Sequence, residues 1–262
     1  MYGPPLMVSR NTMPTRTLPR AVVPWVLDSG GFTELQHHGE WRMPPKEYAA
    51  LVRRYADEVG NLQWAAPQDW MCEPLIINGG VIAGLMPGSI AAKFVGTHLS
   101  VAEHQRRTVF NYLTLRFHAP DLPWIPVLQG WTRDDYMRCV DLYASFLDDF
   151  ETAPTIGVGS VCRRQATAEA ADIFSSLHAL GLNLHGFGLK ALGVATCWPY
   201  LKSADSLAWS LDARLAGQKG ATCGRPNGRG GVVKSCGNCR HYALDWYARA
   251  SSWRKPIQGA LL

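Results

Sequence analysis

Short apolar runs alternate with amphipathic stretches along the first two hundred residues, and this alternation constrains the fold most. The apolar runs are 22–27, 62–66, 124–128, 155–158, 184–187 and a short one that ends near Asp205. Helical spacing of apolar residues marks 45–59, 132–150 and 167–180. Strand–helix alternation is typical of a parallel sheet. We predict an α/β fold, a (β/α)8 TIM-type barrel, with 7–10 and 192–196 supplying missing elements and an open doubly wound sheet as the alternative.

Length and composition exclude several classes of protein. The 262 residues suit one α/β barrel of about 250 residues. No apolar run reaches the ~18 residues that a membrane span needs, so no membrane partner is expected. Seven cysteines, an odd number, argue against a secreted disulfide scaffold, and the start of the chain lacks the apolar core of a secretory signal. A reducing, cytoplasmic location is expected, and the net charge of +5 favours a polyanionic partner.

Polar or glycine-rich residues follow several of the predicted strands. Asp28 begins the sequence DSGGF, and Asp69, Gln129, Gly159 and Asp205 come after later strands. Each of them alone also suits a helix cap or a turn. In a parallel barrel, however, all these strand ends open on one face, and that face carries the active site. We therefore expect the five residues to converge on one pocket.

The ordered set of these motifs resembles a known superfamily. DSGGF, a strand that ends in Asp, VLQG, IGVGS, HGFGLK and SADSLAWS follow one another over roughly 22–245. This order is similar to that of the tRNA-guanine transglycosylases. IGVGSVCRR, HGFGLK and SADSLAWS most resemble the DNA-directed branch, the deazapurine DNA modification transglycosylases of phages and bacterial genomic islands.

The resemblance implies a (β/α)8 barrel that exchanges guanine in DNA for a 7-deazaguanine, with 7-cyano-7-deazaguanine as the expected base. Asp205 would be the nucleophile and Asp28 the general acid/base. Asp69 and Gln129 would read the guanine edge. The other substrate-binding residues implied are Ser29, Gly30, Gly157 and Gly159.

The chemistry of base exchange explains these residue types. A carboxylate nucleophile splits the replacement into two displacements through a covalent glycosyl-aspartate, which retains the anomer. One further carboxyl group can protonate the leaving base and deprotonate the incoming one. A carboxylate accepts from N1–H and the 2-amino group of guanine, and the amide of Gln129 can donate to O6. No phosphate-binding glycine motif of a nucleotide cofactor is present.

DNA is the expected polymer, together with the free 7-deazaguanine base. A duplex hides C1′, so the guanine must be flipped out or lie in a single strand. Phe32, Trp70 and Trp131 are candidates for base stacking, although barrel-rim packing would explain each equally well. Arg163 and Arg164 are the expected phosphate ligands, with Arg225, Arg229, Lys234 and Arg240 as further cations. A homodimer, or proteins that open the duplex, would also suit this chemistry.

A cysteine cluster distinguishes the C-terminal region. Cys223, Cys236, Cys239 and His241 lie within 19 residues, in a Gly- and Arg-rich segment with few core-forming side chains. Three thiols and an imidazole form a standard tetrahedral structural Zn²⁺ site. His241 is the preferred fourth ligand, with Cys197 and His185 as reserves, and free thiols or a redox pair are the alternative. We predict a barrel at 1–216 and a zinc-binding segment at 217–262 packed on it.

Three other functions fit part of these observations. The same chemistry on tRNA is the nearest, although the chain has no appended RNA-binding domain. A non-catalytic zinc-dependent nucleic-acid-binding protein would use the barrel as a scaffold only. A barrel hydrolase of small nucleosides would release free sugar rather than exchange bases.

Overall fold

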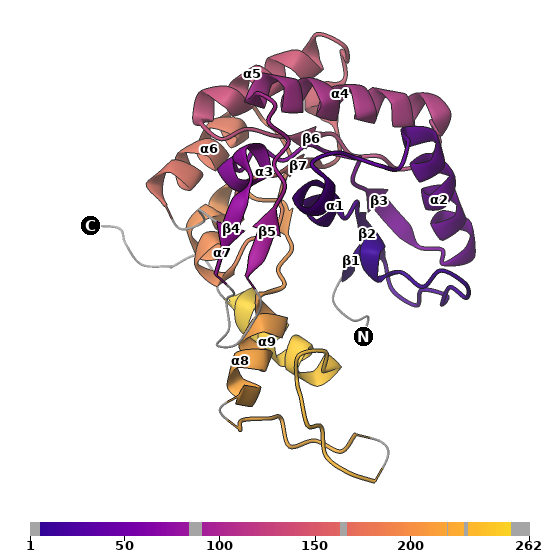
Figure 1. Cartoon of the computed structure of the whole chain (residues 1–262), viewed down its shortest axis with the longest axis vertical. Coiled ribbons are helices and arrows are strands. Elements are labelled where there is room, and N and C mark those ends of the chain that lie inside the picture. The colour runs from indigo at the N-terminus through magenta and orange to yellow at the C-terminus, as the bar shows by residue number, and fades with distance from the viewer. Residues whose placement is uncertain (1–5, 84–90, 163–166, 219, 228–229, 253–262) are drawn as a thin grey trace.

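The computed structural model describes residues 6–83, 91–162, 167–218, 220–227 and 230–252, and shows a mixed α/β fold with two parallel sheets (Figure 1). One sheet has the order β1 (Leu6–Ser9), β2 (Trp25–Asp28), β3 (Leu62–Ala65). The other has the order β6 (Val127–Leu128), β7 (Ile156–Val158), β8 (Leu184–Gly186), β9 (Ser203–Ala204). The predicted parallel arrangement is therefore confirmed, and β1 supplies the element expected at 7–10.

A single parallel bridge between Ala65 and Trp124 connects the two sheets. The run 124–128, expected as one strand, thus pairs with β3 at its start and with β7 at its end. Parallel pairing then runs in chain order through β1, β2, β3, β6, β7, β8 and β9. No pairing between β9 and β1 is found within the described ranges, so the structure shows two parallel sheets and leaves a closed barrel as a prediction.

Helices between the strands cover the outside of the sheets. They are α1 (Gly31–His38), α2 (Pro45–Glu58), α4 (Val101–His118), α5 (Arg133–Ala144), α6 (Ala168–Ala179) and α7 (Ala191–Cys197). Figure 1 shows α2, α4, α5 and α6 in an arc around the strands, and each contacts the next. The helices predicted at 45–59, 132–150 and 167–180 are confirmed, although α5 ends earlier because the residues after Ala144 form turns.

Local sequence explains how these helices begin and which face they bury. Pro45 starts α2, where a missing N–H costs nothing, and Tyr48, Val52 and Tyr55 face the core. Thr132 caps α5, and its hydroxyl and the Asp135 carboxylate exchange hydrogen bonds with each other's backbone N–H. The main core lies between these helices and the two parallel sheets.

Two regions differ from the sequence expectations. The segment 192–196, expected to supply a missing element of the barrel, lies within the helix α7, where Cys197 is buried and Leu192 is exposed. Burial on one side of the helix, rather than on alternate residues, distinguishes it from a strand. An antiparallel pair, β4 (Gly80–Ile82) and β5 (Ala92–Phe94), was not foreseen, nor was the short α3 (Pro74–Asn78). Short 3-10 turns occupy Arg10–Thr12, Phe150–Thr152 and Trp198–Tyr200.

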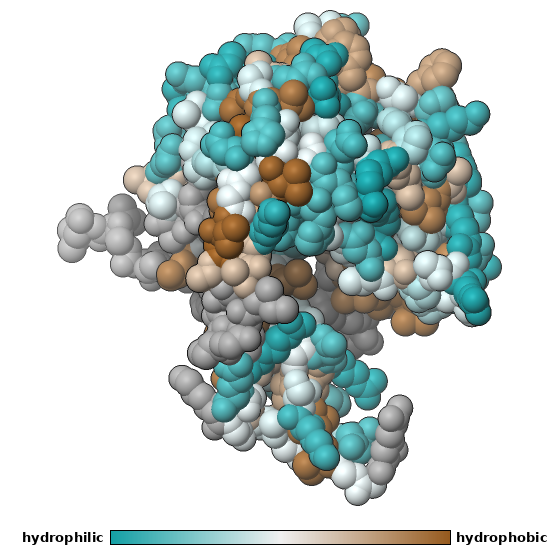
Figure 2. Space-filling model, in the orientation of Figure 1, coloured by the Kyte–Doolittle hydropathy of each residue, from teal (hydrophilic) through white to brown (hydrophobic). Residues whose placement is uncertain are grey.

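The C-terminal region extends away from the sheets. Figure 1 shows α8 (Ala208–Gln218) and α9 (Arg240–Ser252) below the main body, and the two helices contact each other. Their shared core is small and contains Ala213, Cys236 and Cys239. The face in Figure 2 is mostly hydrophilic, with small separate hydrophobic patches. None of the described helices combines the length and apolar character that crossing a bilayer requires.

Candidate active site

The carboxyl ends of the parallel strands bring the predicted polar residues together. Asp28 is the last residue of β2, and Asp205 directly follows β9. Asp69, Gln129 and Gly159 follow β3, β6 and β7. Because the strands are parallel and paired in chain order, these residues lie at the same end of the sheets.

The carboxyl groups of Asp28 and Asp205 interact electrostatically. The N–H of Gly30 donates to Oδ2 of Asp28 at 3.2 Å, in a turn where Gly30 has a positive φ of 76°. Burial raises the pKa of Asp28, a hydrogen bond with the Ser9 side chain partly offsets this, and the charge of Asp205 raises the pKa further. The two carboxyl groups are therefore close enough to interact, although 177 positions separate them in the sequence.

One oxygen of Asp205 is held by its surroundings. Its Oδ1 accepts a hydrogen bond from the N–H of Gly188 at 2.9 Å, and Nε2 of His185 lies 3.3 Å from the same oxygen. Nδ1 of His185 is 2.8 Å from the hydroxyl of Ser203. Nε2 of His185 is buried and has no well-aligned hydrogen-bond partner in the described part of the chain. Sequence reasoning considered His185 only as a reserve metal ligand, and its position in HGFGLK gave no signal of this contact.

Ser29, Asp69 and Gln129 form a buried hydrogen-bonded group beside Asp28. The hydroxyl of Ser29 donates to Oδ1 of Asp69 at 3.2 Å, and the amide of Gln129 donates to Oδ2 at 2.5 Å. Burial, with a further contribution from the charge of Asp28, raises the pKa of Asp69 to about 7. The carboxyl group that faces Ser29 and Gln129 can thus gain or lose a proton near neutral pH.

Ser160 fixes the orientation of the Gln129 amide. Its hydroxyl lies 2.7 Å from Oε1 of Gln129 and 3.0 Å from Oε2 of Glu73, and accepts from the N–H of Cys72. An ionised Asp69 carboxylate can only accept hydrogen bonds, so Nε2 of Gln129 faces Asp69 and Oε1 is left to face the hydroxyl of Ser160. Neither Ser160 nor Glu73 was singled out from the sequence. The positive φ of 56° at Ser160 is visible only in the structure.

Two glycines are required by close contacts next to this group. A Cβ at Gly159 would lie 2.2 Å from Nε2 of Gln129, and one at Gly157 would lie 2.4 Å from the Phe187 ring. Both distances are far below any allowed contact. Any side chain at Gly159 would therefore displace Gln129 and break its bond to Asp69.

The raised pKa of Asp69 predicts how stability depends on pH. In Asp69→Asn, the side chain can still accept from Gln129 and can donate to Ser29. Between pH 4 and 7 the folded wild-type protein binds a proton that the unfolded chain has lost, so wild-type stability falls as pH rises. The variant has no such group, so its unfolding free energy does not fall in this way. The difference in unfolding free energy, Asp69→Asn minus wild type, should therefore rise by about 2 kcal/mol from pH 5.5 to 8.5.

Urea denaturation at the two pH values measures this difference. Asp141→Asn, which changes an exposed acid on α5, is the matched control and should show no such increase. Parallel stability curves for wild type and Asp69→Asn would contradict the raised pKa.

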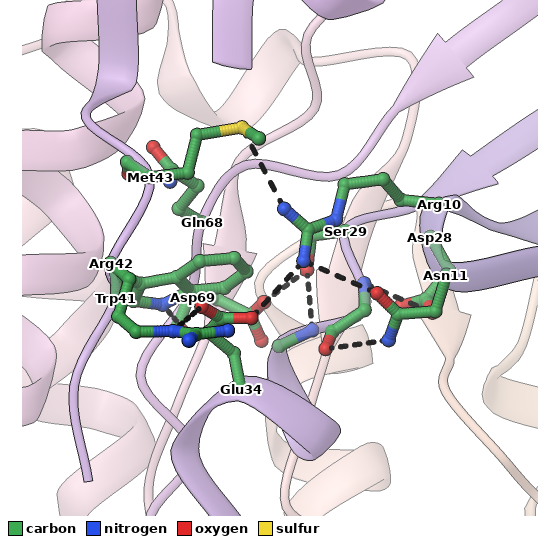
Figure 3. A network of polar contacts seen from close by, with 12 residues as sticks. Arg10, Asn11, Asp28, Ser29, Glu34, Trp41, Arg42, Met43, Gln68 and Asp69 are labelled. Atoms are coloured by element: carbon green, nitrogen blue, oxygen red, sulfur yellow. Dashed lines mark hydrogen bonds and ion pairs between the residues drawn. The ribbon is translucent and has the colours of Figure 1, made fainter. Parts of the chain in front are cut away.

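Figure 3 shows further polar contacts beside Asp28 and Asp69. Glu34 pairs with Arg10 at 3.2 Å and with Arg42 at 3.1 Å, and these arginines lower its pKa against the effect of burial. The indole N–H of Trp41 donates to the backbone oxygen of Asp69 at 3.0 Å. This network holds the loop before α2 against the loop after β3.

The predicted nucleic-acid contacts are only partly visible. Trp70 is 5% exposed and so presents no open stacking face, whereas Phe32, which packs edge-to-face against Phe94, and Trp131 are both partly exposed. Arg163, Arg164 and Arg229 lie outside the described residues.

Three cysteines in the C-terminal region form a group that could bind a metal ion. The Sγ atoms of Cys223, Cys236 and Cys239 all lie within 4.8 Å of one another, and none is in a disulfide. The predicted cysteine cluster is thus brought together. His241 does not join it: Nδ1 of His241 lies 2.7 Å from a guanidinium nitrogen of Arg225. Of the reserve ligands, Cys197 is buried in the main core and His185 lies beside Asp205.

A comparison with protein families identifies the family to which the chain is similar. Residues 1–258 match the model of a protein family described as DpdA: DeoxyPurine in DNA protein A. No curated protein matches the chain. The family match spans both parallel sheets, the carboxylates at their ends and the three cysteines.

Proposed function

The chain belongs to the family of DeoxyPurine in DNA protein A, whose members are DNA-modifying guanine transglycosylases, and from this premise we propose that it replaces guanine in DNA by 7-cyano-7-deazaguanine through a glycosyl-aspartate. The interaction between Asp28 and Asp205 is the observation that carries the proposal. It lies beside the hydrogen-bonded group of Ser29, Asp69 and Gln129, which offers acceptors and a donor to the edge of guanine. The match also agrees with the resemblance found in the sequence. DNA, rather than tRNA, is the polymer that the family favours.

In the proposed first step, Asp205 attacks C1′ of the guanine nucleotide. Because Oδ1 is held by Gly188 and faces His185, the other oxygen, Oδ2, is the attacking atom. The bond between C1′ and N9 breaks, and the departing guanine takes a proton from Asp28. The raised pKa of Asp28 favours the protonated form that this step needs.

In the second step, Asp28 removes the N9 proton of the incoming base. N9 then attacks C1′, and the carboxylate of Asp205 leaves. Two inversions at C1′ retain the anomer, and Asp28 returns to its protonated state. Every proton and bond is thus restored except for the exchanged base.

Asp69 and Gln129 are the proposed readers of the base. As a carboxylate, Asp69 accepts from N1–H and the 2-amino group, and the second amide hydrogen of Gln129 donates to O6. Ser29 and Ser160 hold these two side chains in place. Gly30, Gly157 and Gly159 bring the backbone close to the base.

A (β/α)8 barrel at 1–216 is the proposed scaffold, followed by a zinc-binding segment at 217–262. In a flat sheet with the observed strand order, β2 and β9 would be about 24 Å apart. A carboxylate at that distance would have little influence on Asp28. The contribution of Asp205 to the raised pKa of Asp28 therefore supports a sheet curved until its edges approach. The small core shared by α8 and the cysteines extends across the boundary at residue 216.

Zn²⁺ is the metal ion that we propose for the cysteine group. Three thiols this close, in a core with few other apolar side chains, fit a structural tetrahedral site. Nδ1 of His241 accepts a hydrogen bond from the guanidinium of Arg225, so the ring proton is on Nε2. For His241 to be the fourth ligand, Nδ1 has to leave Arg225 and bind the metal. Bound zinc would hold α8 and α9 together and takes no part in the chemistry.

Removing the zinc is expected to loosen the C-terminal region alone. Chelation, or Cys236→Ser, should abolish binding of one zinc per chain and speed tryptic cleavage between α8 and α9 by about tenfold or more, since ligand binding supplies the folding energy of such a site. Metal analysis and timed proteolysis measure both effects. Cys197→Ala, which changes a reserve ligand, should keep its zinc. Unchanged metal content in Cys236→Ser would show that zinc does not bind at this site.

Mass spectrometry of nucleosides tests the proposed function. DNA and tRNA are each incubated with the protein and isotope-labelled 7-cyano-7-deazaguanine, or another labelled 7-deazaguanine, and then digested. The proposal expects label in DNA, together with released guanine in equal amount. Label in tRNA alone would transfer the chemistry to RNA, free sugar from nucleosides would indicate a hydrolase, and DNA binding without exchange would indicate a non-catalytic reader.

A further inference from the structure

A pocket opens beside the loop that carries Asp69, lined by its two chain neighbours Gln68 and Trp70. Its volume is about 310 Å³. The loop 41–45 before α2 forms one wall, Gln68 and Trp70 form the floor, and Arg107 and Asn111 of α4 close it. The mechanism above uses none of these side chains. At the lower end of the range for ligand sites, the volume suits one nucleotide unit.

Two buried polar atoms of the pocket residues have no partner. Oε1 of Gln68 and Nε1 of Trp70 make no hydrogen bond to any described residue, although Gln68 is fully buried and Trp70 is 5% exposed. The amide of Gln68 cannot simply turn around, because Nε2 donates to the backbone oxygen of Met43 at 2.7 Å. A buried acceptor and a buried donor left unpaired are costly, so such a pair calls for an explanation.

The pocket also has an excess of positive charge on both sides. Glu34 is shared by Arg10 and Arg42, and Glu103 is shared by Arg106 and Arg107. The two arginines lower the pKa of Glu103 to about 2. Each acidic side chain thus neutralises one of its two arginines, which leaves one positive charge in each group.

Arg107 connects this charge to the aromatic floor. Its guanidinium lies 4.5 Å from the centre of the Trp70 ring, and Arg42 next to Trp41 is mostly exposed. An arginine above an aromatic ring can contact a phosphate with its outer nitrogens while it stays stacked. Aromatic rings, arginines and an unpaired donor and acceptor together match the parts of a nucleotide.

We propose that this pocket binds the nucleotide next to the exchanged guanine on the same DNA strand, an inference that rests on the proposed function. The base edge would pair with Oε1 of Gln68 and Nε1 of Trp70, since every nucleobase carries donors and acceptors at its edge. The phosphodiester would lie against Arg42 and Arg107. Asp69, between Gln68 and Trp70 in the chain, reads the guanine, so the two bases would lie on either side of one loop.

Trp70→Phe is the sharpest variant, because it removes the unpaired N–H and keeps a ring under Arg107. Fluorescence anisotropy measures its affinity for single-stranded oligonucleotides with one guanine, in a series where each flanking position in turn is abasic. We expect about tenfold weaker binding than wild type on intact DNA, because one hydrogen bond to the base is lost, and no difference between the two proteins when one particular neighbour of the guanine is abasic. A defect independent of every abasic position, or no defect, would overturn the proposal.

Arg107→Gln tests the phosphate contact without altering the floor of the pocket. Its affinity should fall, and the slope of log K against log salt should decrease by about one unit. Arg53→Gln, an exposed arginine of α2 paired with Asp121, is the matched control and should leave the slope unchanged. Equal slopes for Arg107→Gln and wild type would exclude the phosphate contact, and thermal denaturation checks that each variant is folded.

These binding measurements separate the pocket from the enzyme activity. If the unmutated protein exchanges no base in DNA, but Trp70→Phe still loses the dependence on one neighbouring base, the proposed function is wrong and the pocket stands. If exchange proceeds and neither variant changes DNA binding, the function stands and the pocket inference is wrong.

Discussion

Asp205→Asn is expected to reduce base exchange by at least about 10⁴-fold, because an amide cannot replace a carboxylate as the nucleophile at C1′. The amide keeps the size of the side chain and can still accept from Gly188 through its oxygen. DNA affinity should therefore stay within about threefold of wild type, since binding depends mainly on groups elsewhere. Release of guanine from DNA, in the presence of labelled incoming base, measures the loss.

The covalent intermediate gives a second measurement of the same prediction. With an oligonucleotide and no incoming base, the unmutated protein should form an adduct whose mass equals protein plus oligonucleotide minus guanine. Asp205→Asn should form none, and Asp141→Asn on α5 should form as much as wild type. An adduct in Asp205→Asn would assign the nucleophile to another residue.

Asp28→Asn is expected to slow exchange by about 10²- to 10⁴-fold, the usual contribution of a positioned acid/base. In the wild type, burial and the nearby Asp205 raise the pKa of Asp28, so the protonated acid persists to higher pH. Rates limited by departure of guanine should therefore fall as pH rises through the pKa of Asp28. Rates limited by entry of the new base should rise with pH through the pKa of Asp28 in the glycosyl-enzyme, which is lower because the esterified Asp205 carries no charge.

The pH profiles of the two half-reactions separate this role from a structural one. In Asp28→Asn, neither rate should change with pH through the pKa of Asp28. The yield of covalent adduct at long times should still approach that of wild type. A variant whose rates fall but whose profiles keep their shape would show that Asp28 only shapes the pocket.

Much of the local structure could be predicted from the sequence. The apolar runs located the parallel strands, and Pro45 and Thr132 located two helix starts, because these signals depend on residues only a few positions apart. The kind of element at 192–196 could not be predicted, since a short apolar run does not distinguish a buried strand from a helix with one buried side. The unforeseen pair β4–β5 is also short.

The site was predicted by residue type but not by its contacts. DSGGF, VLQG and SADS identified Asp28, Gln129 and Asp205, and their roles stay proposals. The sequence did not identify three further residues of the site, Ser160, His185 and Glu73. The role of such a residue depends on which groups it contacts in the folded protein. Ser160 faces Gln129 across two strands, which no sequence spacing shows.

The sequence by itself determined the order of the parallel strands and of α2, α5 and α6, the family, and three cysteines near one another in the chain. The tertiary structure decided which oxygen of Asp205 is held, that Asp69 titrates near pH 7, and that Gln68 and Trp70 each leave a polar atom unpaired. The physical reason is range. Helix periodicity and capping depend on neighbours in the chain, whereas burial, charge coupling and hydrogen bonding depend on groups that only folding brings together.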